Sequence, residues 1–171
     1  MNVETLYKIS YGIYIISSNK GEMINGQVAN TVFQITSDPA TMAVSINKKN
    51  LTHDYISSSK AFAVSILNID TPLNFIGQFG FKSGREINKF DGVKYKKGII
   101  AVPVVLDNSV GYLECQVADQ IDCATHTVFI GLIKDAVTLD SKIEPMTYAY
   151  YHFIKKGISP ENAPTYIKKE K

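Results

Sequence analysis

The sequence predicts a mainly β protein whose strands pair antiparallel and close into a barrel, with a few short helices inserted. Six or seven segments are rich in Ile, Val, Phe and Tyr, which favour strands, and turn residues separate them. Helical segments do not alternate regularly with these strands, which argues against a doubly wound parallel sheet. Strands this apolar would expose aggregation-prone edges in an open sheet, and closure into a barrel removes those edges.

Three strands are predicted in the first part of the chain. A short helical turn at residues 3–9 leads into a strand at 11–18, which ends at the turn "NKGE". A second strand runs from residue 23 towards residue 35 and is broken or bulged around Gly26. The third strand, at 41–47, alternates imperfectly between apolar and polar residues, so we expect it to be buried on both faces.

Two short helices are predicted on either side of the next strand. Residues 51–60 read as a helix with Thr52 as its N-cap, because a threonine hydroxyl can accept a hydrogen bond from the first turn. Residues 61–67 form the fourth strand. Thr71 is expected to cap a second helix, which starts with the proline that follows it and stops at Gly80.

The second half of the chain returns to β structure after an irregular stretch. Residues 81–98 are polar and punctuated by glycine, and the apolar run at 102–106 opens the next β region. Residues 109–138 make two long strands with a tight connection near 122–125. From about residue 155 to 171 we expect an extended tail that prolines stiffen.

Composition is that of one ordinary globular domain spanning residues 1–171, with 45% hydrophobic and 20% charged residues. A net charge of +2, carried by dispersed lysines, argues against a nucleic-acid partner. The sequence has no apolar run of the roughly 18 residues that span a bilayer and no signal-peptide layout, so a cytoplasmic protein without a membrane partner is expected. Cys115 and Cys123 lack metal-ligand spacing, and we expect two reduced thiols and no metal site.

Motifs for catalysis by side chains are missing from the sequence. It contains no GxGxxG after the first strand, no GxxxxGK[ST], no GxSxG and no close pair of carboxylates. The chain is poor in charged catalytic residues and rich in Asn, Ser, Thr and aromatic residues. This composition favours a protein that holds a cofactor with its own chemistry, and we predict no catalytic side chain.

The first candidate binding segment is "VANTVFQITS", residues 28–37, which carries many neutral hydrogen-bonding side chains and almost no charge. These side chains either face solvent from a half-exposed strand or pair with a polar ligand. If Asn30, Thr31 and Val32 form an irregular strand end, their backbone and side-chain groups can serve a flat heteroaromatic ring.

The second candidate segment is "SINKKNLTHDY", where a strand leads through two lysines into a helix. A helix N-terminus offers free N–H groups and partial positive charge, which suit a phosphate, although any capped helix looks similar. Nearby lysines, amides and a hydroxyl would add to such a site. The residues concerned are Ser45, Ile46, Asn47, Lys48, Lys49, Asn50 and Thr52.

The third candidate segment is "FKSGREINKF", a Gly-Arg loop followed by Lys89 that could bring cations to a pocket rim or simply face solvent. A strand histidine such as His126 is more often structural than functional. The aromatic cluster at 148–153 is likewise more often part of a core or an interface.

Taken together and in order, several segments resemble the flavin reductase family, whose fold is the FMN-binding split β-barrel with Greek-key-like connections. They are "NGQVANTVFQITSDP", "VSINKKNLTHDYISSSKAFAVSIL", "FKSGREINKF", "THTVFIGLI" and "TYAYYHFIKKGISPENAPTY". The resemblance extends over residues 11–166. The last segment is similar to the end of the reductase domain of high-molecular-weight rubredoxins, and flavoredoxin is a further similar protein. Because no CxxC pair is present, we expect the rubredoxin module to be absent or a separate protein.

The resemblance implies a homodimer with one tightly bound FMN per subunit near the subunit interface. By motif position, Asn30, Thr31 and Val32 would face the isoalloxazine ring. The phosphate and ribityl chain would be surrounded by Ser45, Asn47, Asn50 and Thr52, with Ile46 in the same strand end and Lys48 or Lys49 nearby. The resemblance further implies a charge near the flavin from Lys89, a contact from His126, and contacts from the C-terminal aromatic segment through His152 and Phe153.

The function implied is an FMN-dependent oxidoreductase that accepts hydride from NADH or NADPH and passes electrons to a soluble acceptor. That acceptor would be free flavin, a ferric chelate or a rubredoxin-type protein. Two alternatives stay open: a flavoredoxin-like electron carrier that does not oxidise NAD(P)H, and a non-enzymatic split-barrel protein that binds another ligand or haem. A relative that oxidises pyridoxamine phosphate is disfavoured, because Arg85 is the only arginine in the sequence.

Overall fold

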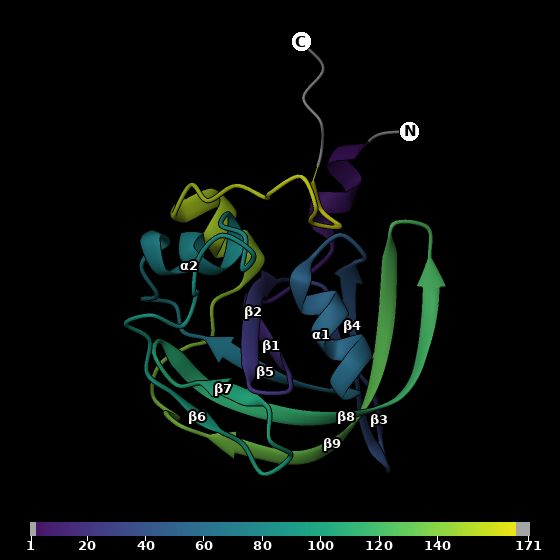
Figure 1. The fold of residues 1–171 in the computed structure, drawn as a ribbon. Coiled ribbons are helices and arrows are strands. Elements are labelled where there is room, and N and C mark those ends of the chain that lie inside the picture. The colour runs from purple at the N-terminus through teal and green to yellow at the C-terminus, as the bar shows by residue number, and fades with distance from the viewer. Residues whose placement is uncertain (1–2, 167–171) are drawn as a thin grey trace.

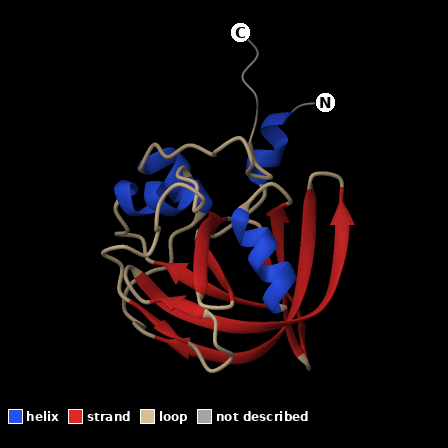
Figure 2. Cartoon of the chain, viewed as in Figure 1, coloured by secondary structure: helices blue, strands red, loops and turns tan. Residues whose placement is uncertain are grey.

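The computed structural model describes residues 3–166, which form a curled seven-stranded sheet with short helices packed on it (Figure 1, Figure 2). From one edge to the other, the strands are β2 (Met23–Ala29), β1 (Tyr14–Lys20), β5 (Ala61–Leu67), β8 (Ser109–Cys123), β9 (His126–Thr138), β4 (Ala40–Asn47) and β3 (Val32–Ser37). A two-stranded sheet pairs β6 (Tyr95–Lys97) with β7 (Pro103–Val105). The helical elements are the 3-10 helix η1 (Val3–Lys8), α1 (Leu51–Ser59), α2 (Leu73–Gly80) and the π-helix η2 (Tyr150–Ile154). All strand pairs named here are antiparallel.

Chain connectivity explains why the large sheet closes into a barrel. Strands β2 and β3 lie at opposite ends of the strand order, yet only Asn30 and Thr31 separate them in the sequence. The three peptide steps from Ala29 to Val32 reach no more than about 11 Å, so the two edges must meet. Within residues 3–166 no ladder joins β2 to β3, and the barrel is therefore split along this seam. The expected antiparallel barrel with a few short helices is confirmed.

The strands β8 and β9 are long enough to take part in both halves of the barrel, with 15 and 13 residues. The first half of β8 pairs with β5, whereas the first half of β9 pairs with β4. Register shifts in the β8–β9 ladder, between Glu114 and Cys115 and again between Val117 and Asp119, allow the pair to bend. The tips of both strands project from the barrel as the green hairpin of Figure 1.

The central strands are buried on both faces, which explains their weak alternation of apolar and polar residues. In β1, Ile15 and Ile16 point to opposite faces and both are fully buried. Ile16 belongs to the cluster inside the barrel, together with Phe62 and Phe129. Ile15 belongs to a second cluster that includes Phe79 of α2. The strand predicted at 41–47 to be buried on both faces is β4, where the neighbours Ala43 and Val44 are both buried.

The prediction of one strand from residue 23 to residue 35 is wrong. The chain breaks at Asn30 and Thr31, not at Gly26, because the two halves belong to opposite edges of the sheet. Gly26 lies inside β2, where a Cβ atom would come within 3.1 Å of Phe79 Cε1. The Phe79 ring leaves little room for a side chain at Gly26, and the glycine does not mark a bulge.

The start of β1 and both helix caps also differ from expectation. Strand β1 begins at Tyr14 and not at residue 11, because Ile13 N donates to the carbonyl of Met146 instead (3.0 Å). The N-cap of α1 is Asn50 in place of Thr52, and that of α2 is Pro72 in place of Thr71. Each threonine hydroxyl is engaged elsewhere, with Asn25 for Thr52 and with the carbonyl of Asn68 for Thr71.

Other expected elements are confirmed, including the first helical turn and the tight connection between β8 and β9. The short strand β6 was not expected within the irregular stretch 81–98. No helix within residues 3–166 is long and apolar enough to cross a lipid bilayer.

Candidate functional site

A cavity of about 290 Å³ lies where β2, the end of β4, the start of α1, the loop after α2 and the C-terminal segment meet. It brings together residues that are far apart in the sequence. Seven of the residues predicted from the sequence line it, namely Asn30, Ser45, Asn47, Lys49, Asn50, Thr52 and Lys89. This cavity is the candidate functional site.

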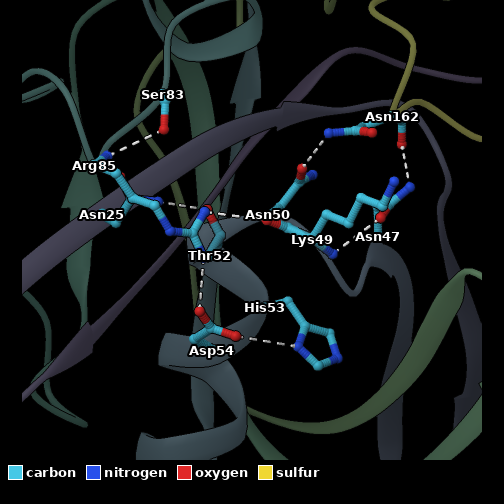
Figure 3. Close-up of polar contacts among 10 residues, drawn as sticks. All are labelled: Asn25, Asn47, Lys49, Asn50, Thr52, His53, Asp54, Ser83, Arg85 and Asn162. Atoms are coloured by element: carbon cyan, nitrogen blue, oxygen red, sulfur yellow. Dashed lines mark hydrogen bonds and ion pairs between the residues drawn. The ribbon is translucent and has the colours of Figure 1, made fainter.

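The turn from β4 into α1 forms one end of the cavity. The backbone N–H of Lys49 donates to Asn47 Oδ1 (3.0 Å), which fixes the turn (Figure 3). Asn50 occupies the N-cap position of the helix without a capping hydrogen bond from its side chain. Leu51 and Thr52, in the first turn of α1, line the cavity. A helix of nine residues carries partial positive charge at this end, so the cavity meets the end of α1 that attracts anions.

Arg85 joins Lys49 at the same end of the cavity. Its guanidinium donates to the carbonyl of Lys49 (3.1 Å) and to Asp54 Oδ2 (2.9 Å), and its own backbone N–H donates to Ser83 Oγ (3.2 Å). These contacts hold the loop after α2 against α1, as Figure 3 shows. The loop therefore brings a cation to the cavity rim and does not simply extend into solvent.

Strand β2 contributes two amides that sequence reasoning missed. Asn25 Nδ2 donates to Thr52 Oγ1 (2.8 Å), and both side chains are buried. Gln27 lies two residues further along the same face, and its Oε1 is buried with no hydrogen-bond partner among the described residues. The signal available in the sequence was the period-two placement of Asn25 and Gln27 in "INGQVAN". A buried acceptor without a donor costs free energy, which a ligand with an N–H group at this point would recover.

Lys89 is a buried cation beside the cavity, with only 6% of its surface exposed. Its ammonium donates to the carbonyls of Gly26 (3.1 Å) and Phe79 (2.9 Å), and no carboxylate pairs with it within residues 3–166. Burial disfavours the charged form and lowers the pKa of Lys89 to about 8. An anionic group in the cavity would stabilise the ammonium.

Four predicted residues near the strand ends do not line the cavity. Thr31 donates to Asn30 Oδ1 (3.2 Å), so it orients a lining side chain. Val32 and Ile46 are buried inside the barrel, which leaves only their backbone for a ligand. Lys48 pairs with Asp122 Oδ2 (3.1 Å), and Lys49 is the lysine that reaches the cavity.

The remaining three predicted residues also lie outside the lining of the cavity. His126 Nε2 is 3.2 Å from the carbonyl oxygen of Asn162, so it contacts the C-terminal segment. His152 stacks on the ring of Tyr148, with centroids 5.8 Å apart, and Phe153 is exposed. Their role toward a ligand stays a prediction.

The C-terminal segment is the largest part of the site that sequence reasoning missed. Residues 158–165 were expected to form an extended tail, yet they line the cavity. Tyr148 and Tyr151, from the aromatic cluster, line it too. No local pattern in the sequence indicates where an irregular, proline-containing segment will dock. Within residues 3–166 no group of three or more His, Cys, Asp or Glu side chains could hold a metal ion.

Comparison with known proteins gives a consistent set of similarities. A family profile described as "Flavin reductase like domain" matches residues 6–155. The chain is 52% identical over 166 residues to a high molecular weight rubredoxin from Moorella thermoacetica, a match that covers 97% of this chain and 72% of that protein. It is 48% identical over 167 residues to a ferric-chelate reductase (NAD(P)H) from Archaeoglobus fulgidus, covering 98% of each chain. The fold resembles that of the flavin reductase HpaC complexed with NADP+, with a TM-score of 0.74, 23% identity, and coverage of 85% of this chain and 89% of that one.

Proposed function

Since the chain belongs to the flavin reductase family and is an oxidoreductase, we propose that it binds FMN tightly and takes hydride from NADH or NADPH. We propose further that its electrons pass to a soluble acceptor, either free flavin, a ferric chelate or a rubredoxin-type protein. The similarity over 98% of both chains to a protein named ferric-chelate reductase (NAD(P)H) supports the donor and the ferric acceptor. The similarity to a high molecular weight rubredoxin supports the protein acceptor.

The observation that carries the proposal is the neutral polar lining of the cavity around the unpaired acceptor of Gln27. An isoalloxazine ring has an imide N–H, carbonyl oxygens and ring nitrogens along one edge, and an apolar edge opposite. Amides and hydroxyls match the polar edge without adding charge. The side chains available for it are those of Asn25, Gln27, Asn30, Ser45, Asn47, Asn50 and Thr52. The residues therefore fit the ring of FMN.

The cationic end of the cavity suits the phosphate of FMN. The N-terminus of α1, Lys49 and Arg85 lie together there. A phosphate monoester is close to doubly charged at neutral pH, and a helix N-terminus with two nearby cations is a favourable setting for it. Arg85 is already held by Asp54 and the carbonyl of Lys49, so little side-chain entropy would be lost on binding.

When bound, FMN supplies the redox chemistry, because its ring accepts hydride and releases electrons. The chain's own residues bind the flavin, orient its ring and stabilise its reduced form. Lys89 holds a proton at Nζ in a buried position, and a positive charge near the ring favours a reduced, anionic flavin. Tyr148 and Tyr151 exclude water from the side of the cavity that faces the C-terminal segment.

We propose that the protein is a homodimer in the cytoplasm, joined through the edge strand β3. Five of the six residues of β3 are exposed, among them Phe33 and Ile35. An exposed apolar edge strand in an otherwise well-packed barrel marks a surface that a partner covers. The free thiols of Cys115 and Cys123 are in keeping with a reducing compartment.

The visible spectrum of the purified protein with FMN, before and after anaerobic NADH or NADPH, tests the proposal. A flavin spectrum that bleaches within the mixing time supports it. A protein that binds FMN but is reduced only by a protein donor is an electron carrier instead. A colourless protein that refuses micromolar FMN, or one that shows a haem Soret band, contradicts the proposal.

A further inference from the structure

The C-terminal segment of residues 158–165 lies across the candidate site, over the barrel and α1, as the yellow chain in Figure 1. We propose that this segment is the outer wall of the flavin site, and that Asn162 is a positioning residue which slows release of the flavin. The inference deepens the proposed function and rests on it, because it assumes that FMN occupies the cavity.

The segment is anchored at its start by two tyrosines whose rings line the cavity. Tyr148 Oη and Ser159 Oγ are 2.7 Å apart, and Tyr151 Oη donates to the carbonyl of Ile158 (2.9 Å). Gly157 N also donates to the carbonyl of Tyr151 (2.9 Å). A Cβ atom at Gly157 would overlap the Tyr151 ring, so only glycine lets the chain turn this closely over the aromatic cluster.

The far part of the segment is hydrogen-bonded to residues that the sequence had already singled out. Asn162 Nδ2 donates to Asn50 Oδ1 (3.1 Å), and its carbonyl accepts from Asn47 Nδ2 (3.3 Å) and lies 3.2 Å from His126 Nε2. Figure 3 shows the contacts of Asn162, on the yellow chain, with Asn47 and Asn50. Further along, Thr165 Oγ1 accepts from Asn30 Nδ2 (2.9 Å).

Short turns and prolines keep the segment in this shape between its anchors. Ala163 N donates to the carbonyl of Pro160 (2.9 Å), and Tyr166 N donates to that of Ala163 (3.0 Å). Pro160 and Pro164 each fix one backbone torsion angle, which lowers the entropy lost when the segment docks. The segment is therefore held at both ends and stiffened in between.

The position of the cavity explains why the docked segment should affect release of a ligand. The cavity lies between the barrel face and the segment, so a ligand inside it would have Asn47 and Asn50 on one side and the segment on the other. A ligand that leaves on the side of the segment would have to break the contacts of Asn162 first. The segment should therefore act on the dissociation rate of FMN more than on the stability of the barrel.

Asn162→Ala and Gly157→Ala test the inference in the full chain, with Asn19→Ala and Gly77→Ala as matched controls. Asn19 is partly exposed, and among the described residues its side chain bonds only to the carbonyl of Gly21. A Cβ atom at Gly77 meets no atom within 4 Å. Flavin release is followed as recovery of flavin fluorescence after the loaded protein is diluted. Asn162→Ala should release FMN roughly threefold to tenfold faster than wild type, because it loses the exposed hydrogen bond to Asn50. Gly157→Ala should also release FMN faster, because its Cβ atom would displace the Tyr151 ring and with it the start of the segment. The controls should match wild type, and the midpoint of thermal unfolding of apoprotein Asn162→Ala should stay within about 2 °C of it.

Tryptic cleavage after Lys156 gives a second measurement, because that bond leads directly into the segment. We expect FMN to slow cleavage of the wild-type protein at this bond and to protect Asn162→Ala much less. Equal release rates for test and control variants, or slower release from the test variants, would overturn the inference and leave the proposed function intact. A wild-type protein that binds no FMN would overturn both.

Discussion

The hydroxyl of Thr52 accepts a hydrogen bond from Asn25 in a pair that is almost wholly buried beside the cavity. Sequence reasoning gave Thr52 two roles, as the cap of α1 and as a ligand contact. The capping role is wrong, since Asn50 is the N-cap, and the hydroxyl instead ties α1 to β2. The residue therefore matters to the fold as well as to a ligand.

The first prediction concerns the double variant Asn30→Ala with Thr52→Ala. It should weaken FMN binding by about tenfold or more, because each change removes a polar group from the cavity lining. The Thr52 change should also lower the free energy of unfolding by about 1–3 kcal/mol, because Asn25 Nδ2 loses its acceptor in a buried setting. Equilibrium dialysis measures the first effect and urea unfolding the second. Thr52→Ser keeps the hydroxyl and serves as the control, and unchanged FMN binding by the double variant would show both assignments to be wrong.

The second prediction concerns pH and Lys89, whose pKa is lowered to about 8 in the folded protein from an ordinary value of 10.5. Between these two values the unfolded chain binds more protons than the folded one, so stability should rise as pH rises through this range. FMN binding should change in the opposite sense, because an anion near Nζ favours the protonated amine. Affinity should be highest below pH 8 and about tenfold lower by about pH 9.

The variant Lys89→Gln tests whether the pH dependence of FMN affinity comes from Lys89 and not from another titrating group. It keeps a hydrogen-bond donor but has no proton to lose, so FMN affinity should be flat between about pH 7 and 9. Lys94→Gln, at an exposed lysine, should keep the wild-type profile. If wild type and Lys89→Gln show the same pH profile in fluorescence titrations, Lys89 does not face the ligand.

At the scale of elements, β8 and β9 are the strands that hold the two halves of the barrel together. Their contact depends on Gly131, where a Cβ atom would come within 2.7 Å of both Cys115 Cβ and Phe62 Cζ. The position lies inside the barrel core, where neighbouring side chains cannot move freely. Glycine here is a packing requirement of the strand pair.

The third prediction is that Gly131→Ala lowers the free energy of unfolding by about 1–3 kcal/mol, as overpacking of a core does. Gly77→Ala, in α2, should instead be neutral or stabilising by about 0.5–1 kcal/mol, because it fills open space and favours helix. Denaturant unfolding of the two single variants provides the comparison. Equal stability of both variants would contradict the packing role of Gly131.

At the scale of the whole molecule, the cavity spans the seam in the barrel, and the exposed edge strand β3 lies on one side of that seam. Strand β3 follows directly after Asn30, which lines the cavity, so a partner that covers β3 would also lie close to the site. The proposed dimer and the proposed cofactor are thus expected to affect one another.

The fourth prediction is that Phe33→Ser combined with Ile35→Ser gives a monomer in sedimentation velocity at concentrations where wild type is a dimer. The two side chains are 56% and 43% exposed, so the barrel itself should lose little stability. Ile99→Ser, at a residue 70% exposed on another part of the surface, is the control and should remain dimeric. A dimeric double variant would place the interface elsewhere.

The strands, the fold class and part of the cavity wall could be predicted from the sequence, because each depends on residues that are close together in the chain. Apart from the strand predicted at 23–35, runs of Ile, Val and Tyr predicted strands within a few residues of their observed bounds. The irregular spacing of helices predicted a barrel. The polar residues at the end of β4 and the start of α1 predicted most of the cavity wall there, because a strand, a turn and a helix start are local features.

Only the tertiary structure showed the contacts between residues that are far apart in the sequence. Asn25 and Thr52 are 27 residues apart, and Asn30 and Thr165 are 135 residues apart. The break between β2 and β3, the role of Gly26 and the docking of residues 158–165 follow from barrel closure and from packing across it. The sequence by itself determined the fold class and half of the site, since local propensities and burial patterns act over a few residues. Only the closed barrel decided which amides share the cavity and what covers it, because those contacts form when distant segments meet.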